Sequence, residues 1–122
     1  MLRQVTQMMI EAKIIDFLKN TAGITNVFAE LPEDVPDEFV ILTLMERSTK
    51  NFITTATFNL YSYAEGKVRA IQLDASVRAS MRLFEGMSDI SSCKQTNGAD
   101  VPDVWLNKYR YSSTYNIVYY DD

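Results

Sequence analysis

The sequence predicts an α+β protein, with a mostly antiparallel sheet and two helices packed on one face of that sheet. Three observations predict this class. The run Lys108–Tyr120 alternates aromatic or apolar side chains with polar ones, as a half-buried strand does. Leu2–Asn20 and Ala64–Gly86 repeat apolar residues at spacings of three and four, as amphipathic helices do. Short polar connections join the remaining strand-like segments and favour antiparallel pairing, so we expect residues 1–122 to form one α+β domain with the order α-β-β-β-α-β-β.

The first predicted helix has a clear apolar stripe and a clear end. Its stripe contains Ile10, Ile14, Phe17 and Leu18. Gly23 follows the last of these, and glycine is the residue that most readily adopts the left-handed conformation of a helix cap.

Two strands and an acidic loop are expected next. Ile24–Glu30 is a short apolar run that suits an edge strand. In the following LPEDVPDE, Pro32 and Pro36 stop regular pairing, which predicts an acidic surface loop. Phe39–Glu46 is apolar on both parities, as in a central strand that is covered on both sides or lies at an interface.

Glu46–Asn51 is polar and predicts a hairpin loop longer than the two-residue type. Phe52–Tyr63 then alternates again and predicts the returning strand. One face of that strand is expected to carry Phe52, Thr54, Ala56, Phe58 and Leu60, and the other Thr55, Thr57 and Asn59.

In the second helix the apolar positions are Ala70, Leu73, Val77, Met81 and Phe84. Asp74 and the helix arginines are expected to face away from them, and Gly86 suits the C-terminal cap. After this helix, Ile90–Thr96 is a candidate strand, and Asn97–Asp103 is a loop by its Asn, Gly, Asp and Pro content.

The second face of the sheet has two interpretations. By the expected register it is largely polar but also carries Val40, Leu42, Ile53, Tyr61 and Tyr63. A mixed face of this kind is typical of a sheet that contacts another subunit. A register error of one residue would instead place these side chains in the core.

Composition excludes several classes of function. A formal charge of −4 argues against generic nucleic-acid binding, and we expect no sequence-specific nucleic-acid partner. The single cysteine excludes an internal disulfide and fits a reducing compartment. Polar residues interrupt every apolar run well before the roughly 20 residues of a membrane span, which predicts a soluble intracellular protein without a membrane partner.

No enzyme signature is found among the residues that could do chemistry. The chain has no histidine, so Cys93 lacks the usual activating base and is expected to be a buried thiol. The acidic loop lacks the spaced ligands of a calcium loop and is expected to be solvated. Arg69, Arg78 and Arg82 with Lys67 form one basic strip, which either contacts nucleic acid or an acidic partner or is a solvated helix face. We therefore expect no catalytic residue, metal or cofactor.

Four segments together resemble a known family. They are IIDFLKNTAGITNVFAELPEDVPDEFVIL, FITTATFNLYSY, AEGKVRAIQLDASVRASM and YRYSSTYNIVYY. Within the first, Val27, Pro32, Pro36, Phe39 and Val40 carry the most suggestive spacing. The chain resembles the tail-terminator (tail-completion, head–tail joining) proteins of tailed bacteriophages and prophages along its whole length.

The resemblance implies a non-enzymatic assembly protein with an α+β fold. It would form a ring, commonly of six subunits, that caps the tail tube and joins it to the head connector. Its partners would be itself, the tail tube protein and head connector proteins, first in the cytoplasm of the bacterial host and then in the virion. Acidic loops meeting basic strips between neighbours would close such a ring. The candidate contact residues are Glu33, Asp34, Asp37, Arg47, Ser48, Lys50, Arg69, Arg78 and Arg82.

Two other interpretations remain. One is a head–tail connector adaptor or stopper of the same particle, which only its partner would distinguish. The other is a small α+β ligand-binding domain or enzyme with a site built from scattered residues, for which a deep pocket would be the sign.

Overall fold

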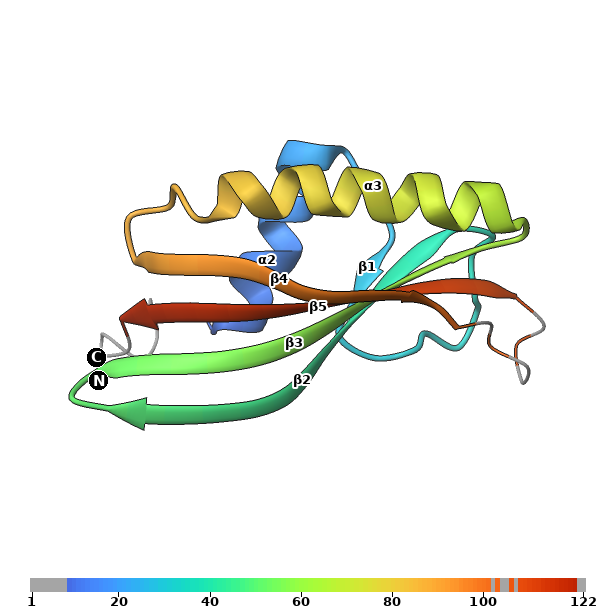
Figure 1. The fold of residues 1–122 in the computed structure, drawn as a ribbon. Coiled ribbons are helices and arrows are strands. Elements are labelled where there is room, and N and C mark those ends of the chain that lie inside the picture. Colours follow the sequence, from blue (N-terminus) through green and yellow to red (C-terminus); the bar gives the residue numbers. More distant parts are fainter. Residues whose placement is uncertain (1–8, 102, 104–105, 107, 121–122) are drawn as a thin grey trace.

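A computed structural model describes residues 9–101, 103, 106 and 108–120 and shows helices beside a five-stranded sheet (Figure 1). The elements are α2 (Ile10–Phe17), its π-helical continuation η1 (Leu18–Ala22), β1 (Val27–Phe28), β2 (Phe39–Lys50), β3 (Ile53–Ala64), α3 (Lys67–Phe84), β4 (Ile90–Asp100) and β5 (Tyr109–Tyr120). The α+β class and the order α-β-β-β-α-β-β are those expected from the sequence. The start of the first expected helix lies outside the described residues.

The sheet has the order β1-β2-β3-β5-β4. All its neighbours are antiparallel except β1 and β2, which run parallel through Val27↔Val40 and Phe28↔Ile41. The parallel pair is possible because the acidic loop between these strands is long enough to bring the chain back in the same direction. The two edges of the sheet are therefore β1 and β4, and both matter for the surfaces described below.

The main core lies between the helices and one face of the sheet. The expected alternation of the last strand is confirmed from Ser113 onward, where Ser113, Tyr115, Ile117 and Tyr119 are buried on this face, but not at the start of the strand, where Tyr109 is exposed. The core is completed by Ile10, Ile14 and Leu18 from the first helix, Val40, Leu42, Ala56, Phe58 and Leu60 from the sheet, and Val77, Met81 and Phe84 from α3. Gly23 caps the first helix with a φ of 69°, as expected.

The second face of the sheet carries a smaller core and an open polar region. Phe39, Ile41 and Tyr63 are buried there, because Val35 of the acidic loop and other loop side chains pack over them. Figure 1 shows this loop (cyan) on the side of the sheet opposite α3. The start of β2 is therefore covered on both sides, as its apolar sequence predicts.

The expected assignment of Val40 and Leu42 to this second face is wrong. Both belong to the helix-facing core, because Phe39 and Ile41 take the other parity. Beyond the small core, the second face is polar. Thr57 donates a hydrogen bond to Asn116 at 2.8 Å, and the adjacent Thr114 donates one to Asn59 at 2.6 Å. Several apolar side chains expected to be exposed on this face are therefore buried in the main core or in the small core.

The hairpin between β2 and β3 also differs from the expectation. Lys50 pairs with Ile53, so the loop has only two residues, Asn51 and Phe52, with φ values of 54° and 66°. Positive φ at both positions is what the tight primed turn requires. Glu46–Lys50 is polar because this half of β2 is exposed, not because it is a loop. Phe52 consequently lies in the turn and not on the strand face expected for it.

Three smaller expectations are corrected as well. Asn97–Asp100 is the end of β4, paired with β5, so the loop begins only at Val101. Gly86 does not have a positive φ; α3 ends at Phe84, and the Gly86 N–H bonds back to the Leu83 carbonyl at 3.0 Å. Asp74 is buried rather than facing away from the sheet, for reasons that concern the site itself.

Candidate functional site

The expected basic strip on α3 is in fact two separate surfaces. Arg78 follows Arg69 by nine residues, which is half a turn out of phase on a helix of 3.6 residues per turn. Arg69 therefore faces the connection between η1 and β1, whereas Arg78 and Arg82 face β4. We call these two sides the Arg69 flank and the Arg78 flank.

On the Arg69 flank the arginine is already occupied. Its Nε and Nη2 donate to the two carboxylate oxygens of Glu38 at 2.8 and 2.7 Å, and its Nη1 donates to Gln72. The hydrogen bonds from Arg69 lower the pKa of Glu38. This pair joins the end of the acidic loop to α3 within one chain, so Arg69 contributes to the fold on its own flank.

On the Arg78 flank the corresponding carboxylate is buried. Asp74 is only 1% exposed, accepts a hydrogen bond from Ser113 of β5, and accepts another from Arg78 Nε at 2.9 Å. Burial raises the pKa of Asp74, although Ser113 and Arg78 act in the opposite direction. The expectation that Asp74 faces solvent failed because its partner, Ser113, lies 39 residues away in sequence.

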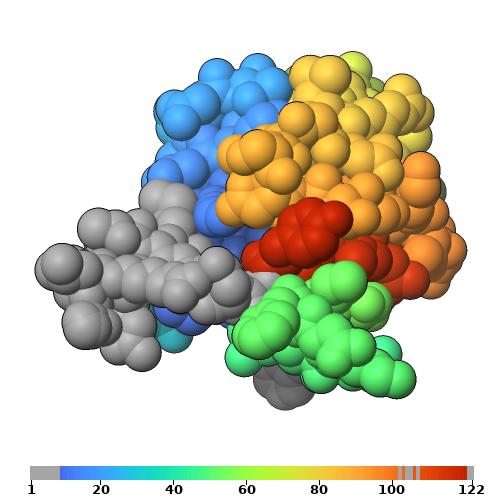
Figure 2. Space-filling view, turned by 90° about the vertical axis from the view of Figure 1, so that its left-hand side faces the viewer, coloured from blue at the N-terminus to red at the C-terminus, as the bar shows by residue number. Residues whose placement is uncertain are grey.

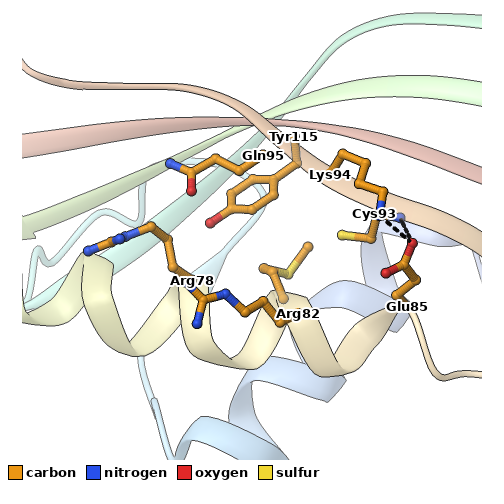
Figure 3. A pocket seen from close by; sticks show the side chains of 8 residues that line it. Arg78, Arg82, Glu85, Cys93, Lys94, Gln95 and Tyr115 are labelled. Carbon is orange, nitrogen blue, oxygen red and sulfur yellow. Dashed lines mark hydrogen bonds and ion pairs between the residues drawn. The ribbon is translucent and has the colours of Figure 1, made fainter.

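A cavity of about 200 Å³ opens beside this pair, between α3 and β4 (Figure 3). Arg78 and Arg82 line it from the helix, and Lys94 and Gln95 line it from β4. Tyr115 of β5 points from the sheet toward Arg78 in Figure 3 and closes the inner end of the cavity. We call this space the α3–β4 cavity.

The hydroxyl of Tyr115 is the unusual atom of the cavity. The residue is 2% exposed, yet its hydroxyl has no hydrogen-bond partner within the described part of the chain. Burial raises the pKa of Tyr115 and the Asp74 carboxylate adds to the rise, so the phenol keeps its proton and can donate it. The Ser113 side chain opposes this rise through hydrogen bonding toward the phenol, but its own hydroxyl hydrogen goes to Asp74 and its position does not meet the geometry of a hydrogen bond with Tyr115. Buried hydroxyls are usually paired, so an unpaired buried donor beside a cavity points to a ligand there.

The charges around the cavity leave an excess of one positive charge. Arg78 pairs with Asp74, and Lys94 pairs with Glu85 at 3.3 Å. Arg82 is exposed and forms no ion pair or hydrogen bond with any described residue. An anion that entered the cavity would therefore meet a free guanidinium and a free phenol donor.

Cys93 lines the same cavity and is buried, as expected. Burial raises its pKa to about 12, and the nearby Glu85 carboxylate adds to the rise. The thiol is therefore protonated at neutral pH, and a thiolate is the form that a nucleophile requires. Cys93 is therefore expected to pack as a small apolar residue and not to react as a nucleophile.

A second surface lies at the far end of the β2–β3 hairpin. Phe52 is 71% exposed, and next to it Ile53 and Tyr120 are paired across β3 and β5 and are also exposed. Figure 1 shows the outer halves of β2 and β3 diverging from α3, and Figure 2 shows the hairpin end (green) beside the end of β5 (red). We call Phe52, Ile53 and Tyr120 the hairpin tip.

The backbone conformation of Phe52 is a second reason to regard the hairpin tip as a contact surface. A positive φ is rare for a bulky residue and costs roughly 1–3 kcal/mol, and glycine would fit the position without that cost. A strained, exposed aromatic residue contributes little to the folded state of a monomer. Such outliers are a reason to look for a function.

The remaining candidate contact residues lie on two exposed segments. Arg47, Ser48 and Lys50 lie on the outer half of β2, and their side chains have no partner among the described residues. The carboxylates of the acidic loop are exposed and likewise unpaired within the described chain; they are Glu33, Asp34 and Asp37. Arg69 reaches the neighbouring Glu38, but no α3 arginine forms an ion pair or hydrogen bond with any of these side chains within the described chain.

Sequence reasoning missed the residues that make these surfaces distinctive, namely Tyr115, Lys94, Gln95 and Phe52. One signal was present for Tyr115, because a tyrosine on the buried parity of a strand carries a hydroxyl that needs a partner. For Phe52 there was only a partial signal, because Asn51 suits the first position of a tight primed turn but the second position favours glycine over a bulky side chain.

No protein-family model and no curated protein matches the chain. Among the described helices, none combines the length and apolar character needed to cross a membrane. Within the described residues, no three His, Cys, Asp or Glu side chains gather in a way that could hold a metal ion.

Proposed function

We propose that the chain is a non-enzymatic assembly protein of a tailed-bacteriophage or prophage particle, a tail terminator that caps the tail tube as a ring and joins it to the head. Its partners are further copies of itself, the tail tube protein and the head connector proteins. It acts in the cytoplasm of the bacterial host and then at the head–tail junction of the virion.

The observation that carries this proposal is the hairpin tip. An apolar group on a strained turn, held away from the helices by two long strands, suits insertion into a neighbouring molecule. The resemblance along the whole chain supplies the kind of neighbour, and the observed α+β fold agrees with the fold that the resemblance implies. The exposed Arg47, Ser48 and Lys50 on the same hairpin can form the polar rim of such a contact.

One observation favours a second candidate from another class. The α3–β4 cavity contains a buried, unpartnered donor, which is also the sign of a small ligand-binding domain. A head–tail connector adaptor of the same particle would use the same surfaces toward a different partner.

The test is sedimentation velocity over a wide range of protein concentrations, alone and with tail tubes assembled from the same particle. We expect a closed ring of about six subunits, the number that the resemblance implies, either free or on the tube end. A chain that stays monomeric alone and does not bind tube ends contradicts the proposal and favours the ligand-binding domain.

Two variants at Phe52 separate assembly from folding. Phe52→Gly removes the ring and the strain, so we expect the free energy of unfolding to rise by about 1 kcal/mol while association falls. Phe52→Ala, the matched control, removes the ring but keeps the strained backbone, so association should fall without that gain in stability. Wild-type association in both variants would show that the hairpin tip is not a contact.

A further inference from the structure

We propose that the α3–β4 cavity is a carboxylate-binding site, and that its occupant is an acidic side chain from residues 29–38 of a second copy of the chain. The occupant rests on the proposed function, because it makes the cavity one half of the contact between ring neighbours. The carboxylate site itself rests only on the geometry of the cavity.

The first step of the argument is the donor set. The Tyr115 hydroxyl lies at the inner end of the cavity and has no hydrogen-bond partner among the described residues. Arg82 lines the cavity and likewise forms no hydrogen bond or ion pair with a described residue. A carboxylate has two oxygens, which one phenol and one guanidinium can satisfy together. Arg78 also lines the cavity; Asp74 engages its Nε, which leaves the outer nitrogens of the guanidinium for a ligand.

The second step concerns the two carboxylates already present. Asp74 accepts from Ser113 and Arg78, and Glu85 accepts from Lys94 and from the Cys93 N–H. Neither carboxylate has a hydrogen bond with the Tyr115 hydroxyl. The cavity thus keeps a donor and a positive charge that the chain's own acids do not use.

The third step identifies the occupant by position. The loop of residues 29–38 connects β1 to β2 at one side of the sheet, whereas the cavity adjoins β4 at the other edge. Within one copy, Val35 of the loop packs on the face of the sheet opposite α3 (Figure 1), whereas the cavity lies on the helix side, between α3 and β4. A contact between them must therefore join two copies through unlike surfaces, which is the arrangement that closes into a ring.

The fourth step is charge complementarity. Glu33, Asp34 and Asp37 are exposed and unpaired within the described part of the chain, so they lose no internal ion pair on binding. Pro32 and Pro36 restrict the backbone of the loop, which lowers the entropy lost when the loop docks. The acidic loop therefore offers free carboxylates, which are the groups that the Tyr115 hydroxyl and the Arg82 guanidinium can bind.

The first experiment measures binding of a synthetic peptide, AELPEDVPDE, to the full chain by isothermal titration calorimetry, at concentrations where the chain is monomeric. We expect binding that weakens with salt and is lost with the control peptide AELPQNVPNE, in which the three central carboxylates are amides. Tyr115→Phe and Arg82→Gln should each weaken binding about tenfold, because each removes a charge-assisted hydrogen bond. Lys19→Gln, an exposed charge on η1, is the matched control and should bind as the wild type does.

Tyr115→Phe also distinguishes a binding role from a structural one. Its hydroxyl has no internal partner, so the urea midpoint of unfolding should not fall when the hydroxyl is removed. Equal peptide binding by Tyr115→Phe and wild type would overturn the proposal, as would equal binding of the two peptides by wild type.

The second experiment tests the occupant by charge exchange. Arg82→Glu should weaken ring formation about tenfold in association constant, and adding Glu33→Lys and Asp34→Lys should restore part of it. If rings form but ignore both changes, the inference about the occupant is wrong while the proposed function stands. If the peptide binds but no ring forms, alone or on tubes, the carboxylate site stands and the proposed function fails.

Discussion

The two flanks of α3 carry the same pair of groups in opposite settings. On the Arg69 flank, an exposed arginine holds Glu38 through two hydrogen bonds, and the pKa of Glu38 is lowered. On the Arg78 flank, an arginine holds the buried Asp74 through one nitrogen, and the pKa of Asp74 is raised. Burial therefore outweighs the arginine on one flank and not on the other.

This difference decides what each flank can do. The Arg69–Glu38 pair is complete, so it fastens the end of the acidic loop and offers little to a partner. The Arg78–Asp74 pair lies beside Tyr115 and Arg82, whose donors are not used inside the described chain. The comparison teaches that an ion pair marks a binding surface only where its surroundings leave donors unsatisfied.

The largest expected effect comes from removing one arginine from each flank. Arg78→Met leaves the buried Asp74 with Ser113 as its only partner among the described residues, so the free energy of unfolding should fall by about 2 kcal/mol at pH 7. Arg69→Met exposes Glu38 to water, which replaces the lost hydrogen bonds, so the loss should be much smaller. Urea denaturation of the two variants checks this, and equal losses would break the comparison.

Much of the fold could be predicted because period and alternation are local. The two periodic helices and the alternating last strand suffice for the class and the element order. The wrong predictions concern residues whose face or secondary structure is set by contacts with segments distant in sequence. Val40 and Leu42 were assigned to the wrong face because Phe39–Glu46 is apolar on both parities, and Asn97–Asp100 looks like a loop although pairing with β5 makes it a strand.

The candidate site could be predicted only in part, for a similar reason. The exposed acidic loop and the basic character of α3 follow from the sequence. The separation of Arg69 from Arg78 follows from helix geometry, although the run of basic residues alone suggests a single strip. The role of Tyr115 depends on Asp74 taking Ser113 as its donor, a contact between distant segments that no local pattern shows.

The pH dependence of stability sharpens the comparison further. Because the folded pKa of Asp74 lies above its ordinary value of 3.8, the folded state takes up a proton there more readily than the unfolded state. Asp74 therefore favours folding most below pH 3.8 and loses that contribution as pH rises through the raised pKa. For Glu38 the folded pKa lies below its ordinary value of 4.5, so its contribution is present above pH 4.5 and is lost as pH falls.

Asp74→Asn and Glu38→Gln remove these titrations with little change in shape. As pH falls from 7 toward 4, wild type should gain stability relative to Asp74→Asn and lose stability relative to Glu38→Gln. Thermal or urea unfolding at each pH measures both differences. Differences that move in the same direction would show that the two carboxylates share one environment, against the structure.

The smallest expected effect is on peptide binding, when the ion pair between Lys94 and Glu85 at the edge of the cavity is removed. Lys94 and Glu85 form a partly exposed pair, and the Cys93 N–H also donates to the same carboxylate at 3.3 Å. Glu85→Gln keeps an oxygen for that N–H but removes the negative charge, so binding of the peptide AELPEDVPDE should tighten by about two- to threefold. Glu65→Gln removes a more exposed carboxylate (64% against 34% for Glu85) that pairs with Lys108 away from the cavity, and should leave binding unchanged. Calorimetry at low salt resolves the difference, and tighter binding by both variants would mean that net charge attracts the peptide rather than the α3–β4 cavity.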